Sequence, residues 1–235
     1  MLELTHVSHD FGTHWALKNL SFSLKQGDFL FLTGPSGAGK TTLLRVIHGD
    51  IPLKRGNAFV AGFDLRNMKP RQIPMLRRQV SVVFQDFKIL PNLSVYANVA
   101  LPLEVRGLAR PRIERRVRAI LRSLHLDNKS QTPCRELSGG EQQRVGIARA
   151  VVVNPKILLA DEPTGNLDPY LSRKLLAIFR QFHRHGTTVV FATHSKELIS
   201  TIPDAKILVL KNGMVAGANF ESAEIGTSPH EDDAA

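Results

Sequence analysis

The amino-acid sequence predicts an α/β fold in which helices pack on a mainly parallel core sheet. Short apolar runs of strand length alternate with helical patterns through most of the 235 residues, as in parallel α/β proteins. One such run, Phe29–Thr33, leads directly into a glycine-rich loop and then into a helical pattern. The residues before it alternate between polar and apolar types, which is typical of a small antiparallel sheet. The chain length fits a single domain with an insertion.

The first elements follow from local pattern. Leu2–Val7 and Leu20–Leu24 alternate in polarity, so we expect two strands of an N-terminal antiparallel β subdomain. Gln26-Gly27-Asp28 predicts a turn after the second strand. Phe29–Thr33 is nearly continuous in apolar residues, which indicates a strand buried on both faces. A helix through His48 is expected to follow the glycine-rich loop.

Later elements are expected wherever the same patterns recur. Strands are predicted at Val80–Phe84, Ile157–Asp161, Val189–Ala192, Ile207–Leu210 and, after an Asn212-Gly213 hairpin turn, Met214–Ala216. Helices are predicted at Val95–Val105, at Arg112–Leu124 with Pro111 as the first residue, and from a Ser138 cap to about Val153. Because strands and helices alternate here, the core sheet is expected to be mainly parallel.

Composition places the chain among ordinary globular proteins. Hydrophobic residues make up 43% and charged residues 22%, which excludes disordered, collagen-like and disulfide-stapled classes. No apolar run approaches the roughly 18 residues of a spanning helix, and the N-terminus lacks the pattern of an export signal. The single cysteine, Cys134, has no internal disulfide partner and is expected to be a small buried residue. These features favour a reducing compartment, the cytoplasm.

The charge of the chain is unevenly distributed. The formal net charge is +10, yet no Lys or Arg follows Lys211 and acids gather near the C-terminus. We expect residues 218–235 to form a disordered acidic tail. The remaining chain is then more basic still, which fits nucleic acid, an anionic membrane surface or an acidic partner. Charge alone does not choose among them.

Residues 34–41 match the phosphate-binding pattern G-x-x-x-x-G-K-[ST] between a strand and a helix. The glycines let backbone N–H groups close on phosphate oxygens, Lys40 brings a cation to the β and γ phosphates, and Thr41 offers a hydroxyl to Mg²⁺. The helix N-terminus adds its partial positive charge. The predicted nucleotide-binding residues of this phosphate-binding loop are Gly34, Pro35, Ser36, Gly37, Ala38, Gly39, Lys40, Thr41 and Thr42.

Two acids and a histidine follow neighbouring strands of the predicted sheet. Asp161 ends the strand at 157–161 and is placed to hold Mg²⁺, and Glu162 comes next as the candidate general base. His194 follows the strand at 189–192 on the same edge. The alternative for the acids is a strand-end acid that caps the Pro163-Thr164 turn, and a lone histidine at such a place is more often structural. Because the carboxyl ends of parallel strands meet at one edge, we expect Lys40, Glu162 and His194 to form one site.

Leu137–Arg144 resembles the signature sequence of the ATP-binding-cassette (ABC) ATPases, and it lies in the family's order between the phosphate-binding loop and Asp161-Glu162. The resemblance covers about residues 1–217, a single ABC ATPase domain, and implies an inserted helical subdomain over about 88–155. It implies that ATP and Mg²⁺ are bound. The family roles fall on Gln85 (catalysis and Mg²⁺), Phe11 (adenine), His194 (switch histidine), and Ser138, Gly139, Gly140, Glu141 and Asp168 (ATP contacts).

The signature suggests how two chains assemble. Ser138, Gly139 and Gly140 begin a helix and form a second anion-binding end, whereas the phosphate-binding loop already serves one side of the triphosphate. In ABC proteins the signature of one subunit completes the other subunit's site in a head-to-tail dimer. Because this chain has one of each, the resemblance implies an ATP-dependent homodimer that separates after hydrolysis.

A finer resemblance is to the FtsE family of cell-division ATPases. It rests on Val83–Asn92, Val95–Val99, Leu101–Val105 and Leu159–Asp168. Gln85-Asp86-Phe87, the short chain and the lack of a fused membrane segment favour that family over the lipoprotein-release and macrolide-efflux ATPases, which share Ala160–Asp168. The resemblance implies a membrane partner, FtsX, a peripheral position on the cytoplasmic side of the cell membrane, and signalling to cell-wall hydrolases.

Rival functional classes fit the sequence less well. ABC ATPases that act on DNA resemble this cassette with long coiled coils or zinc modules inserted, and the chain has neither sustained heptads nor zinc-binding cysteines. We therefore expect no nucleic-acid partner. An inactive scaffold would lack Lys40, Asp161, Glu162 or His194, and all four are present.

Three features keep two interpretations each. Trp15 competes with Phe11 as the adenine platform. The apolar segment after Gln85 is either interior or a groove for a cytoplasmic helix of the membrane partner, formed by Phe87, Ile89, Leu90, Leu93, Val99, Leu101 and Leu103. The arginines between Arg106 and Arg122 form either a solvated helix or a surface for anionic lipid headgroups.

Overall fold

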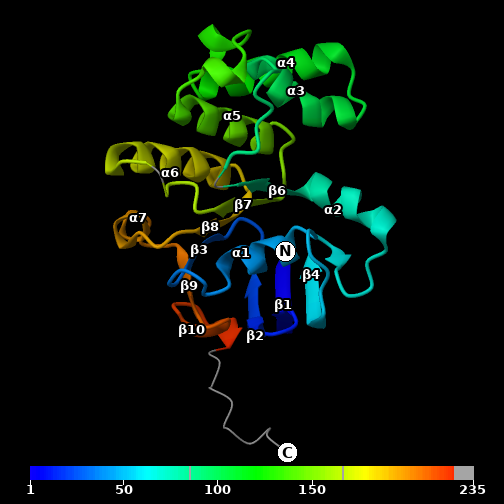
Figure 1. The fold of residues 1–235 in the computed structure, drawn as a ribbon, viewed down its shortest axis with the longest axis vertical. Helices are drawn as coiled ribbons and strands as arrows, with labels where there is room; N and C mark the ends of the chain where they lie inside the picture. Colours follow the sequence, from blue (N-terminus) through cyan, green and yellow to red (C-terminus); the bar gives the residue numbers. More distant parts are fainter. Residues whose placement is uncertain (85, 166, 225–235) are drawn as a thin grey trace, which may run out of the picture.

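The computed structural model describes residues 1–84, 86–165 and 167–224, which form two sheets and a set of helices (Figure 1). The expectations for Gln85 and for a disordered tail over 225–235 fall outside the described residues. No helix among the described residues is long and apolar enough to cross a membrane.

The strands and helices with predicted bounds are present, although the first strand extends to Asp10 and the second begins at Trp15, five residues before its expected start. The sequence predicts no bounds for the other elements. The strands are β1 (Leu2–Asp10), β2 (Trp15–Leu24), β3 (Phe29–Thr33), β4 (Arg55–Val60), β5 (Phe63–Asp64), β6 (Val80–Val83), β7 (Ile157–Asp161), β8 (Thr188–Ala192), β9 (Lys206–Lys211), β10 (Met214–Ala218) and β11 (Ala223–Glu224). The α-helices are α1 (Lys40–Ile47), α2 (Ile73–Gln79), α3 (Val95–Val105), α4 (Arg110–Ser123), α5 (Gly139–Val151), α6 (Pro169–Arg184) and α7 (Lys196–Ser200).

The core sheet has six strands in the order β10-β9-β3-β8-β7-β6, and all its neighbours are parallel except β10 against β9. The mainly parallel sheet is therefore confirmed. The carboxyl ends of β3, β7 and β8 meet at one edge, so the residues that follow these strands share one end of the sheet.

A second, antiparallel sheet has the order β11-β2-β1-β4-β5 and confirms the N-terminal β subdomain. Its last strand corrects the expected boundary at residue 217, because residues 218–224 are folded. Ala223 pairs with Phe22 and Glu224 with Ser21, and the backbone N–H of Ser23 donates to the carbonyl of Ser222. The acidic composition hid this strand, since its order comes from pairing with a segment 200 residues away.

Two apolar cores lie on opposite faces of the parallel sheet, and β3 contributes to both. Phe29 and Phe31 pack with α5 and α6 in one core, whereas Leu30 and Leu32 pack with α1, β1 and β2 in the other. All four side chains are buried, as expected for a strand covered on both faces. This double burial fixes where β3 ends, and so where the loop after it begins.

The helices α3, α4 and α5 form the end of the molecule farthest from β10 (Figure 1). Helix α3 has the bounds expected from the sequence, whereas α4 begins at Arg110, one residue before the predicted start. Burial divides the proposed groove after residue 85: Val99 and Leu103 are core residues, whereas Leu90 and Leu93 are exposed. Because Val99 and Leu103 are buried, they cannot contact a partner.

Candidate active site

The loop between β3 and α1 is held against neighbouring backbone at two glycines. Gly34 and Gly39 have φ of 144° and 103°. A Cβ at Gly34 would overlap the carbonyl oxygen of Leu210, and one at Gly39 would lie 2.5 Å from the carbonyl oxygen of Ala16. Only glycine satisfies both the backbone angle and the close approach at these positions. The loop is therefore fixed between β9 and β2 with its N–H groups leading into α1.

Lys40 is almost fully buried, at 5% exposure, and its ammonium has three acceptors around it. The Nζ atom donates to the carbonyl oxygens of Gly34 at 2.9 Å and Pro35 at 3.0 Å. It also lies 3.2 Å from Oε1 of Glu162. A buried cation needs such partners to offset its lost hydration. The predicted meeting of Lys40 with Glu162 is thus present in the structure.

Glu162 lies between a lysine and a histidine. Its second carboxylate oxygen, Oε2, is 3.4 Å from Nδ1 of His194, whose side chain is largely exposed. The backbone of Glu162 has φ of 44°, a left-handed conformation that costs a non-glycine residue about 1 kcal/mol or more. The backbone N–H of Glu162 donates to the carbonyl of Ala192, which holds the turn against the end of β8. Neighbouring structure thus maintains a strained residue at the centre of the site.

Thr41 and Asp161 offer two hard oxygen ligands to a divalent cation. The Thr41 hydroxyl donates to Oδ1 of Asp161 at 3.0 Å. Burial raises the pKa of Asp161 above its usual value, and the nearby charge of Glu162 acts in the same direction. A cation would relieve both effects. Among the described residues no cluster of three or more His, Cys, Asp or Glu side chains forms a metal cage. Two protein oxygens completed by phosphate and water suit Mg²⁺.

The signature segment forms the start of α5 with a complete capping box. The hydroxyl of Ser138 accepts from the Glu141 N–H at 3.4 Å, and Oε2 of Glu141 accepts from the Ser138 N–H at 2.9 Å. A hydrogen bond from Lys129 Nζ at 2.5 Å, aided by that from Ser138, lowers the pKa of Glu141 to about 2. Ser138 and Gly139 are exposed. The N-terminus of α5 therefore presents its N–H groups at the surface.

The structure separates the predicted residues into two groups. Lys40, Thr41, Asp161, Glu162 and His194 contact one another at the edge of the sheet. No hydrogen bond or ion pair between described residues joins Ser138, Gly139, Gly140 or Glu141 to that cluster. Asp168 has no hydrogen bond or ion pair to either group and caps α6, accepting from the N–H of Leu171 at 2.9 Å.

Both candidates for the adenine platform are exposed on the hairpin of β1 and β2. Phe11 is 48% exposed and packs between the rings of His9 and His14, whereas Trp15 is 39% exposed beneath the guanidinium of Arg55. The hairpin reaches the phosphate-binding loop, because the strand following Trp15 abuts Gly39. The geometry leaves both aromatic residues as candidates.

Two contacts of the signature helix were missed by sequence reasoning. The side-chain amide of Gln143 donates to the carbonyl of Pro163, next to Glu162. Arg149 donates through Nη2 to the carbonyl of Phe87 at 2.9 Å, and Gly146 packs against the same residue. Both link α5 to segments beside the site. Each joins residues at least 20 positions apart through a main-chain oxygen, which no local pattern signals.

Comparison with known families agrees with this geometry. A family model described as ABC transporter matches residues 17–165, which include the phosphate-binding loop, the signature and the two acids. The chain belongs to the ABC transporter family. It is an ABC-type ATPase, with the family's α/β fold and ATP as its nucleotide.

Named relatives share most of the chain. A protein named "Cell division ATP-binding protein FtsE" from Escherichia coli strain K12 is 46% identical over 92% of this chain and 98% of its own length. Proteins of the same name from Streptococcus pneumoniae strain D39 and Bacillus subtilis strain 168 are 44% and 42% identical, over 88% and 85% of this chain and 89% and 87% of their own.

Solved structures of ABC cassettes share the fold. The cassette MJ0796, described as a dimer in a post-hydrolysis state bound to ADP and Pi, matches with a TM-score of 0.84 and 31% identity over 93% of this chain and 98% of its own. CbiO1 from Clostridium perfringens, part of the complex cbiONQ, matches with a TM-score of 0.85 and 27% identity over 92% and 87%.

Proposed function

We propose that the chain is the ATP-hydrolysing subunit of an FtsEX-type complex in cell division. It dimerises on ATP and signals through the membrane protein FtsX to cell-wall hydrolases. The contact of Lys40 with Glu162 and His194 at the edge of the sheet carries the enzymatic part. The FtsE relatives, which match over nearly their whole length, support the biological part.

Glu162 is proposed as the general base. A triphosphate in the phosphate-binding loop competes with Glu162 for Lys40, because phosphate oxygens are the stronger counter-charge for a lysine aligned with the loop. The carboxylate released from Lys40 is then free to accept a proton from the attacking water. His194 lies on its other side and is placed to orient that water or contact the γ phosphate. Gln85 completes the predicted catalytic set.

Thr41 and Asp161 are proposed to hold Mg²⁺, with Gln85 as a third predicted ligand. The hydroxyl and the carboxylate already contact each other, and the carboxylate lacks a cationic partner among the described side chains. Mg²⁺ bound there would neutralise charge on the β and γ phosphates. The chain's own contribution is to fix both oxygens on buried elements, the start of α1 and the end of β7.

The separation of the signature from the catalytic cluster supports a homodimer. Ser138, Gly139 and Gly140 lie at an exposed helix N-terminus, where they can receive the phosphates of a partner's nucleotide. Asp168 is the N-cap residue of α6 and is proposed to contribute to the same interface between the two subunits. The dimeric state of MJ0796 makes this arrangement reasonable for a chain with the same fold.

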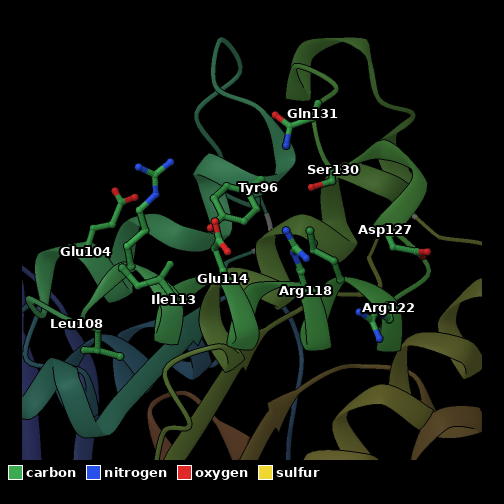
Figure 2. Close-up of a pocket in the computed structure, with 12 residues that line it drawn as sticks. Tyr96, Glu104, Leu108, Ile113, Glu114, Arg118, Arg122, Asp127, Ser130 and Gln131 are labelled. Atoms are coloured by element: carbon green, nitrogen blue, oxygen red, sulfur yellow. The ribbon is translucent and has the colours of Figure 1, made fainter.

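A hollow beside α3 and α4 is the proposed docking groove for the membrane partner. It has a volume of about 920 Å³, and Figure 2 shows Tyr96, Glu114 and Arg118 pointing into it. Leu108 and Ile113 add apolar surface, and burial raises the pKa of Tyr96. An apolar floor with acids and bases around it suits a short amphipathic segment of a membrane protein. We propose this groove in place of the one expected from the apolar segment after Gln85, because Val99 and Leu103 of that set are buried.

Co-purification tests the proposed function. The chain is expressed with its chromosomal neighbour, carrying Glu162→Gln to trap the ATP-bound dimer, and is solubilised in mild detergent. We expect recovery of a four-span membrane protein with one large extracytoplasmic loop. Recovery of a lipoprotein-binding permease pair would instead assign the chain to the release-type ATPases and overturn the cell-division proposal.

A charge reversal tests the groove within the same assay. Glu114→Lys changes a groove side chain, and Glu3→Lys makes the same change at an exposed site on β1. We expect the first to reduce recovery of the partner at least about tenfold. A basic group of the partner that pairs with Glu114 would then face a like charge, which costs several kcal/mol. The second should leave recovery unchanged. Equal recovery with both variants would remove the groove from the partner interface.

A further inference from the structure

Helix α4 carries a row of arginines on the side turned away from the core. Ile113, Val117 and Leu121 are buried, whereas Arg112, Arg115, Arg118 and Arg122 are exposed. Positions three and four apart lie side by side on a helix, so these four guanidinium groups share one surface. We refer to this set of four residues as the α4 arginine face. Helix α4 itself lies at the end of the molecule opposite β10 (Figure 1).

No ion pair or side-chain hydrogen bond within the described chain neutralises the α4 arginine face, although the acid Glu114 lies beside it. None of the ion pairs between described residues includes any of its four arginines, and none of their side chains makes a hydrogen bond there. By contrast, nearby Arg106 donates to the carbonyls of Val153 and Arg78. Like charges three or four positions apart destabilise a helix. An external anion would relieve that repulsion.

The surface between these arginines fits headgroup phosphates better than nucleic acid. A shallow recess of about 440 Å³ is lined by Pro111, Glu114, Arg115, Arg118, Ala119 and Arg122. It contains no aromatic ring on which a base could stack, whereas stacking platforms are typical of single-strand binding. One guanidinium group can donate two parallel hydrogen bonds to two oxygens of the same phosphate. Pro111 and Ala119 are the small side chains of this recess, so the longer arginine side chains beside them can reach a densely charged surface.

We propose that the α4 arginine face binds anionic lipid headgroups directly and so holds the ATPase against the membrane surface. The expected orientation of α4 toward the membrane rests on the proposed function, because Arg118 and Arg122 line both this recess and the proposed docking groove. A segment of a membrane protein seated in that groove lies close to the bilayer, which brings α4 to the headgroups. The lipid contact itself needs no partner.

Vesicle sedimentation of the purified chain without any partner tests the proposal. Vesicles of phosphatidylcholine alone are compared with vesicles that also contain phosphatidylglycerol. We expect binding only to the anionic vesicles, weakening as salt is added. The variant Arg112→Gln/Arg115→Gln/Arg118→Gln should lose at least about tenfold in apparent affinity. Replacing the same three residues by Lys should retain binding within a few-fold, because the charge remains.

A matched control removes the same charge elsewhere. The triple variant Arg71→Gln/Arg180→Gln/Arg184→Gln changes exposed positions away from α4 and should bind as the unaltered chain does. If both Gln variants lose the same vesicle affinity, net charge alone explains the binding and the proposal is overturned. Binding to phosphatidylcholine vesicles as strong as to anionic vesicles would also overturn it.

Two further measurements separate the remaining outcomes. Binding of single-stranded RNA through the same arginines, without vesicle binding, would assign the face to nucleic acid and overturn the lipid proposal. Unchanged ATP turnover and thermal melting would show that the Gln variants are folded. Because the assay contains no partner, failure to recover FtsX would refute the proposed function and leave this result standing.

Discussion

At the residue scale, the site is a small network in which each charged group restrains another. Lys40 is held by two carbonyl oxygens and by Glu162, and Glu162 is held in turn by a strained backbone and by His194. The strain is maintained because the turn after β7 is hydrogen-bonded to the end of β8. The carboxylate is thus held in place without a nucleotide, and in the proposed mechanism ATP displaces it from the lysine.

Replacing Asp161 by Asn should stabilise the nucleotide-free protein while abolishing Mg²⁺-dependent hydrolysis. Burial raises the folded-state pKa of Asp161, so its ionised form opposes folding above that pKa. Asn removes the charge and keeps an oxygen for the Thr41 hydroxyl. We expect the melting temperature at neutral pH to rise by about 2–4 °C.

The pH dependence identifies the cause of that stabilisation. As the pH falls through the folded-state pKa, the wild-type carboxyl becomes neutral and its destabilisation disappears. The difference in melting temperature between the two proteins should therefore shrink in acid. A variant less stable than the wild type at neutral pH would show that the ionised carboxylate stabilises the fold, contrary to this account.

At the element scale, the glycines that connect β3 to α1 differ in how closely neighbouring backbone approaches them. Gly39 lies against the carbonyl of Ala16, whereas a Cβ at Gly37 would meet open space. Gly37→Ala should cost about 1–2 kcal/mol, the penalty for a left-handed alanine. Gly39→Ala should cost more and weaken ATP binding, because β2 or the loop must move. Urea unfolding and nucleotide titration measure both, and equal effects would contradict the packing argument.

The start of α5 provides an acid-sensitive prediction. The pKa of Glu141 is lowered from its ordinary value of 4.5 to about 2 in the folded state by its hydrogen bonds to Lys129 and Ser138. Its contribution, about 1 kcal/mol for a capping interaction, is therefore complete above pH 4.5 and lost as the pH falls toward 2. Glu141→Gln should be destabilised in urea at pH 7 and progressively less so in acid.

The exposed Glu3→Gln variant is the control for that experiment. Its free energy of unfolding should follow that of the wild type across the same pH range, since Glu3 takes part in no ion pair between described residues. A Glu141→Gln deficit that stays constant down to pH 2 would show that charge does not stabilise the capping box.

Elements with local signals were predictable, and those that depend on distant pairing were not. The bounds of α3 and β7 agree with their apolar patterns, and the phosphate-binding loop has an unmistakable spacing. Strand β11 depends on pairing with β2, and the contact of Arg149 with Phe87 depends on a carbonyl 62 positions away. The sequence also did not show that Val99 lies inside the helical end, because α3 is apolar around most of its circumference.

At the scale of the whole molecule, each of the two apolar cores holds a different part of the proposed site. The core between α1 and the two sheets fixes the phosphate-binding loop, whereas the core beneath α5 and α6 fixes the signature and Asp168. The phosphate-binding loop and the signature are the two proposed halves of a nucleotide site, and no hydrogen bond or ion pair joins them within the described part of one chain. A second copy, turned head to tail, would bring each half to its complement.

The most direct test of that claim mixes two inactive variants. Lys40→Ala removes the lysine of the phosphate-binding loop. Gly139→Asp introduces a negative charge at the signature, where there is open space for a side chain and where an acid suits the helix N-terminus. Each variant alone should be unable to hydrolyse ATP, because every site in its homodimer lacks one half.

Mixing the two variants in equal amounts should restore hydrolysis to about one quarter of the wild-type rate if the sites act independently, since half of the dimers are mixed and each has one intact site. Only chains that fold can contribute, so recovery also verifies the folding of both variants. A mixture no more active than its components, or full activity of Gly139→Asp alone, would contradict a site shared between two chains.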